Sequence, residues 1–169
     1  MKVLYIFSVF FHILSAITWV GGMLFIAAVV VPTTRKEVDR LLAARLTRKM
    51  GERFRAVSWV CLGMLVLTGL FNLSHHNTLS RALLLPIFWR SEFGRILAIK
   101  LVLVFSILIL SLLHDFILGP RVMALLESDH PDLTAVVRQR KSVTWLARLN
   151  LLLALGVVMC GILLARWVL

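Results

Sequence analysis

Charged residues are scarce in this sequence, and acidic ones are the scarcest: of 169 residues, 8 are Asp or Glu and 19 are Lys or Arg. Charged residues amount to 16% and hydrophobic residues to 60%, whereas soluble domains contain about 45–50% apolar residues. The charges are clustered, and they leave four long stretches nearly free of charge, each of about the 20 residues that a bilayer core requires. This pattern excludes a water-soluble globular domain and indicates an integral membrane protein.

Cysteines and the common enzyme motifs are also nearly absent. The two cysteines, Cys61 and Cys160, lie within apolar runs, so an extracellular disulfide framework is excluded and both are expected to be small buried hydrophobic side chains. There is no phosphate-binding glycine loop, HExxH, CxxC or Ser-His-Asp arrangement, so hydrolase and nucleotide chemistry have no support. We ascribe the net charge of +11 to topology and anionic lipid rather than to nucleic acid.

Four apolar runs predict an all-α integral membrane four-helix bundle, in a single membrane domain over residues 1–169. The expected helices cover about residues 3–31, 55–77, 95–118 and 145–168, with basic loops at about 32–54 and 119–144. The first run continues without the cleavage site of a signal peptide, so it is expected to be retained. Gly119 and Pro120 are expected to close the third helix.

Basic residues in short loops predict the orientation. Thirteen of them lie in segments 35–55 and 121–148, and five lie toward the other side. Loops one and three should therefore face the cytoplasm, with both termini on the outer, periplasmic side of a bacterial inner membrane. Segment 37–55 mixes leucines with basic residues, which predicts an extension of the second helix or an amphipathic helix on anionic lipid.

Small and polar residues mark helix interfaces in lipid, and each run carries a stripe of them at spacings of three and four. The stripes are Tyr5, Ser8, His12, Ser15, Ala16, Trp19 and Gly22; Ser58, Cys61, Thr68, Asn72 and His75; Lys100, Val104, Ile107, Ser111 and His114; and Asn150, Ala154, Val157 and Gly161. We expect all four stripes to face a common interior.

Ionisable side chains at membrane depth are costly and are therefore functional candidates. His12 lies about nine residues into the first helix, roughly 13 Å deep, and imidazole is a common ligand of haem iron and copper. The alternative is a histidine that hydrogen-bonds a neighbouring helix. Lys100, about six residues into the third helix, could bind a porphyrin propionate or a substrate carboxylate, or its stem could reach the headgroups.

His114 lies fourteen residues after Lys100, so it is roughly 21 Å deeper. On straight helices this distance separates it from His12, so the two do not share one metal. Because Asp115 is its neighbour in sequence, we expect His114 to form a hydrogen bond near the membrane interface.

His75 and His76 stand at the outer end of the second helix. If that helix continues, one of them approaches the depth of His12. They are the candidates for a second axial ligand of a haem iron, with His75 as the metal ligand. The alternative is an adjacent pair in a wet outer loop.

Two motifs resemble the copper-resistance D (CopD-like) membrane domain. FHILSAITWVGG at residues 11–22 resembles that family's His-x6-Trp-x-Gly-Gly opening, and SEFGRILAIKLVLV at 91–104 resembles its Phe-Gly-Arg-x-Leu-x-x-Lys helix start. The dipeptide Thr68-Gly69 matches its preceding helix. The chain is also similar to the related four-helix HemJ-like protoporphyrinogen oxidases, whose first-helix histidine and tryptophan match His12 and Trp19 and whose third-helix lysine matches Lys100.

The HemJ-like pattern extends further along the chain. Its later histidine falls near His114, and the Arg-x-Asn-Glu start of its last helix falls near residues 148–150, although Leu151 stands in place of the glutamate. Its Tyr-His pair after the first helix is absent from residues 31–34. The resemblance implies the shared element, a b-type haem held through His12 with Lys100 nearby.

Three functions are compatible with the sequence. The first is a haem-b membrane protein in electron transfer or in quinone- or porphyrin-linked oxidation, with His12 on iron, Trp19 packed on the ring, and Lys100 as the catalytic residue that binds the propionate or substrate anion. The second is copper transport or resistance, which needs soft Met and Cys ligands along a path. The third is a cofactor-free assembly subunit. The expected partners are anionic lipid, a quinone or redox protein, and a second copy of the chain, but not nucleic acid.

Overall fold

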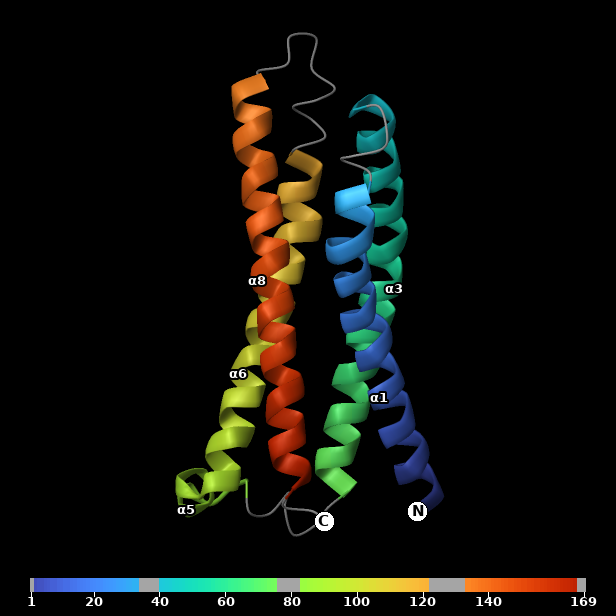
Figure 1. Ribbon diagram of the computed structural model, residues 1–169. Coiled ribbons are helices and arrows are strands. Elements are labelled where there is room, and N and C mark those ends of the chain that lie inside the picture. The colour runs from blue at the N-terminus through green and yellow to red at the C-terminus, as the bar shows by residue number, and fades with distance from the viewer. Residues whose placement is uncertain (1, 34–39, 76–82, 122–132, 167–169) are drawn as a thin grey trace. The chain divides into compact units, whose positions relative to one another are not determined.

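The computed structural model describes residues 2–33, 40–75, 83–121 and 133–166, and every regular element in these ranges is a helix. The elements are α1 (Lys2–Phe25), α3 (Arg40–His75), α5 (Pro86–Arg90), α6 (Glu92–Leu112) and α8 (Leu133–Ala165), with π-helical turns η1 (Ile26–Val30) and η2 (Leu113–Leu118) (Figure 1). The predicted all-α fold is confirmed.

Four helical segments within the described residues are long and apolar enough to cross a membrane: Lys2–Thr33, Lys49–His75, Glu92–Arg121 and Lys141–Ala165. Their surfaces expose large apolar side chains such as Ile17, Val60 and Val102. Apolar surface of this extent is characteristic of a lipid-facing protein. The chain is therefore a multi-pass integral membrane protein.

The helices form two pairs, one in residues Met1–Phe88 and one in Trp89–Leu169. In the first, α1 packs along α3, and in the second, α6 packs along α8 (Figure 1). Tyr5 lies against His75 near the start of α1 and the end of α3, so α1 and α3 are antiparallel. Ser111 near the end of α6 reaches Asn150 in the middle of α8.

The predicted polar stripes lie in the interfaces of these pairs. Of the first two stripes, Ser15, Trp19, Cys61 and Thr68 are buried, with Trp19 only 5% exposed. Of the last two, Ile107, Ser111 and Ala154 are buried, and Ala154 is 1% exposed. Cys61 and Cys160 are free and buried, as expected. The common interior for all four stripes stays a prediction.

Two helices begin earlier than the sequence pattern predicts. α3 begins at Arg40 and α8 at Leu133, so the loops expected at 32–54 and 119–144 are helical over their later parts. The reason is composition, because Arg, Leu, Ala and Lys are strong helix formers whatever their charge. The interpretation of segment 37–55 as an extension of the second helix is therefore the better one.

Gly119 and Pro120 do not end the third helix as predicted, since helical geometry continues to Arg121. A proline ring clashes with the carbonyl four residues earlier. For Pro120 that residue is Phe116, which lies within η2, and for Pro32 it is Ala28, within η1. Each helix thus widens into a π turn at the carbonyl group with which the proline ring would clash, and then continues.

Candidate functional site

His12 points from α1 to α3 and contacts Thr68 there. Its Nδ1 atom is 2.8 Å from Thr68 Oγ1. The Thr68 hydroxyl donates to the carbonyl oxygen of Met64, 2.5 Å away on the previous turn. Ser8, one turn before His12, donates to the carbonyl oxygen of Thr68 at 3.4 Å. Polar residues of the two predicted stripes therefore meet at one level of the α1–α3 pair.

The Thr68 hydroxyl determines which nitrogen of His12 carries the proton. Two oxygens 2.5 Å apart need a proton between them, so the single hydroxyl hydrogen of Thr68 is directed to Met64, the usual back-bond of a threonine within a helix. Thr68 Oγ1 then accepts, and His12 Nδ1–H donates. In a neutral imidazole this leaves the lone pair on Nε2. Histidines that bind metals through Nε2 have this arrangement, with Nδ1–H held by a fixed acceptor.

Glycines allow the close approach that this contact needs. A Cβ atom at Gly69 would lie 3.4 Å from His12 Cε1, the carbon between the two ring nitrogens. Gly22 faces the ring of Phe54 so closely that a Cβ atom there would clash with it, whereas a Cβ atom at Gly21 would meet nothing within 4 Å. Gly22 therefore sets the spacing of α1 and α3, and Gly69 leaves room for the imidazole.

Asn72 follows Thr68 by one turn, and its Oδ1 atom is buried without a hydrogen-bond partner among the described residues. A buried acceptor of this kind typically marks the position of an ordered water or a ligand donor. His75 follows on the next turn, where its ring stacks on Tyr5, with centroids 5.0 Å apart, and on Phe71, with centroids 5.8 Å apart. Polar groups therefore continue along α3 beyond the His12 contact.

The structure does not bring His75 to His12. His75 lies seven residues beyond Thr68, which is about 10 Å along the helix axis. Two imidazoles on opposite sides of one iron have nitrogens about 4 Å apart, twice a metal–nitrogen bond. At this separation His75 and His12 lie on different turns of the α1–α3 pair, and His75 stacks on Tyr5 and Phe71. Its role as a second axial ligand stays a prediction. His76 lies outside the described residues.

The donor set fits a haem better than a bare metal ion. Among the described residues, no three His, Cys, Asp or Glu side chains gather where they could hold a metal ion. A haem brings four nitrogens of its own and requires as little as one protein ligand, which His12 can supply. Trp19, two turns from His12 on the same stripe, is buried.

Lys100 belongs to the other pair and lies eight residues into α6 from Glu92, about 12 Å along the axis. Its side chain is half-buried and lies within electrostatic range of Cys160 on α8. No described residue accepts a hydrogen bond or forms an ion pair with its ammonium group.

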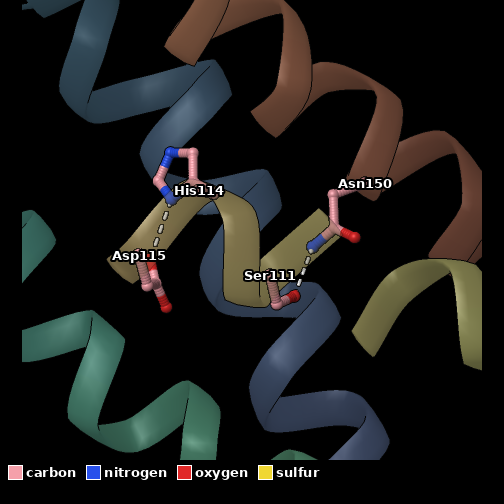
Figure 2. Close-up of polar contacts among 4 residues, drawn as sticks. All are labelled: Ser111, His114, Asp115 and Asn150. Atoms are coloured by element: carbon pink, nitrogen blue, oxygen red, sulfur yellow. Dashed lines mark hydrogen bonds and ion pairs between the residues drawn. The ribbon is translucent and has the colours of Figure 1, made fainter. Parts of the chain in front are cut away.

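His114 lies in η2 and donates from Nδ1–H to the Asp115 carboxylate, with Nδ1 and Oδ1 2.8 Å apart (Figure 2). The expected hydrogen bond beside Asp115 is thus present. One turn earlier, Asn150 Nδ2 donates to Ser111 Oγ at 3.3 Å, which links α8 to α6. The sequence pattern placed Ser111 and Asn150 on facing stripes, but it gave no sign of which residues would pair.

The fold and the site define a class of protein, a helical multi-pass membrane protein with polar groups buried between paired helices. Within this class, the chain belongs to the family described as Domain of unknown function (DUF4149), which matches residues 14–131. A similar protein is an uncharacterized protein of Aquifex aeolicus (strain VF5), 29% identical over 154 residues, which are 90% of this chain and 90% of that protein. No solved structure matches the chain.

Proposed function

We propose that this chain is a haem-b-binding redox protein of the bacterial inner membrane, with His12 as the protein ligand of the iron. The observation that carries the proposal is the hydrogen bond from His12 Nδ1 to Thr68, which leaves the lone pair on Nε2. The resemblance to the CopD-like and HemJ-like families supports it. The basic residues of segments 35–55 and 121–148 and the relative in a bacterium support the inner-membrane location.

The chain's own residues would prepare the site before any ligand arrives. Thr68 holds the imidazole of His12 in one tautomer and one orientation, which lowers the entropic cost of binding. Asn72 offers a buried amide oxygen to a hydrogen-bond donor one turn away, and Trp19 on the same stripe as His12 is buried. A haem bound here would supply one-electron redox chemistry.

Lys100 is the second part of the proposal, as an anion-binding residue of the α6–α8 pair. A half-buried ammonium group in a membrane span is costly without a counter-charge. Because no described residue supplies that charge, we propose a substrate carboxylate as its ligand. Replacement of Lys100 by methionine tests this part of the proposal.

The decisive experiment is an absorption spectrum with metal analysis of the protein purified in detergent. We expect a Soret band, an α-band on reduction, and about one iron per chain. His12→Ala should remove the pigment, whereas Ser106→Ala should keep it, because the Ser106 hydroxyl donates to the Val102 carbonyl oxygen of its own helix at 2.9 Å. A colourless, metal-free preparation made with ample haem would contradict the proposal, and bound copper without haem would favour copper transport.

A further inference from the structure

A separate polar cluster lies at the end of the third membrane span. Its members, which we call the η2 cluster, are Ser111, His114, Asp115 and Asn150 (Figure 2). His114 is seven residues before Arg121, the last residue of the span Glu92–Arg121, or about 10 Å along the axis. At this depth, a ligand of His114 can come from the lipid as well as from water.

The contact between His114 and Asp115 lies within the π turn η2. Neighbouring residues on a regular α-helix do not face each other, yet these two side chains are 2.8 Å apart, and π turns frequently occur at functional sites. The Asp115 side chain is 14% exposed and that of His114 is 35% exposed. The Asp115 carboxylate is thus shielded from solvent, and it accepts a hydrogen bond from one ring nitrogen of His114. The other ring nitrogen points away from Asp115 (Figure 2).

The turn before His114 has an unused hydrogen-bond acceptor. Asn150 donates to Ser111 through Nδ2, but its Oδ1 atom is buried and no described residue donates to it. Ser111 is three residues before His114 and therefore on the same face of the helix. The cluster can thus accept hydrogen bonds at His114 Nε2 and at Asn150 Oδ1, and an O–H group would satisfy either atom.

The surroundings of the cluster are apolar. Ile117 lies three residues after His114 and therefore on the same face of the helix; it is 39% exposed and lies within a membrane span. A molecule that reaches His114 through this surface must therefore be apolar over most of its area and carry a small polar head. A flat ring with hydroxyl or carbonyl oxygens and an apolar tail matches both the apolar surface and the two hydrogen-bond acceptors.

We propose that the η2 cluster binds the headgroup of a membrane quinol or its quinone. In the quinol form, a ring hydroxyl donates to His114 Nε2, and Asp115 is the positioning residue that fixes the imidazole through Nδ1. Asn150 Oδ1, one turn away, can accept a hydrogen bond from a water molecule that bridges it to the headgroup. Quinone binding itself does not depend on haem. Only the interpretation that the quinol exchanges electrons with a haem rests on the proposed function.

The test is photolabelling of the full-length protein in lipid nanodiscs with an azido-substituted quinone, followed by mass mapping of the labelled peptides. We expect saturable labelling within residues 103–121 that unmodified ubiquinone or menaquinone competes away. His114→Leu should abolish it, and Asp115→Asn should weaken the affinity about tenfold, the effect of one poorly held hydrogen bond. His114→Gln, which keeps a polar amide, should restore part of the binding, and Ser106→Ala should match the wild type.

Several results would overturn the inference: no saturable labelling, labelling that unmodified quinone fails to compete, equal competition by phosphatidylglycerol, or unchanged labelling in His114→Leu. Thermal melting of each variant, measured alongside, separates loss of the site from loss of the fold. Haem content provides the second distinction. Quinone binding by a colourless protein would support this inference and contradict the proposed haem-binding function. A red protein that does not bind quinone would support the proposed function and contradict this inference.

Discussion

Replacement of Thr68 by valine tests the role of one hydroxyl in the His12 site. Valine has nearly the shape of threonine, so the buried position should remain filled. His12 Nδ1–H loses its acceptor, while the Met64 carbonyl oxygen loses only an extra donor and the Thr68 carbonyl that Ser8 contacts is unchanged. Losing the partner of a ligating histidine typically lowers metal affinity by about 10–100-fold. This matches the about 1–3 kcal/mol cost of a buried N–H without an acceptor.

The assay is titration of the haem-free protein with haemin in detergent, followed by the change in Soret absorbance. Thr68→Ser is the matched control, because it keeps the hydroxyl and removes one methyl group. We expect Thr68→Ser to bind within a few-fold of the wild type and Thr68→Val to bind about 10–100-fold more weakly. If valine and serine variants bind equally well, the hydroxyl does not hold the ligand, and the argument from the His12 tautomer fails.

Three further variants test other parts of the structure. Gly22→Ala should destabilise the protein by about 1–3 kcal/mol through overpacking against Phe54, whereas Gly21→Ala should not, because its Cβ meets nothing; thermal melts in detergent compare the two. His75→Phe should leave the haem spectrum unchanged, because phenylalanine preserves stacking on Tyr5, and a lost or shifted Soret band would make His75 a ligand after all. Lys100→Met should fold normally but bind an anionic substrate more weakly, measured as a dissociation rate, and an unchanged rate would leave Lys100 a purely structural residue.

Helix content was predictable because the spans are long, apolar and almost free of charge, and the stripes identified the faces that pack within each pair. Helix ends were less predictable, because charge and helix propensity disagree near them. Segment 40–54 is basic, which suggested a loop, yet its residues favour a helix and α3 includes it. Pro120 suggested a stop, but one π turn before it absorbs the clash. Such a local adjustment has no signature in residue spacing.

The candidate site shows the same division between what one helix determines and what two helices determine together. Depth and periodicity within α1 are enough to single out His12, and the same is true of Thr68 and His75 within α3. Which of the two meets His12 depends on the register between the helices, and that register is set by close contacts such as Gly22 against Phe54. A shift of two turns would exchange a hydroxyl partner for a second imidazole, and with it a single-histidine site for a bis-histidine site. Which side chain faces His12 is therefore a property of helix packing.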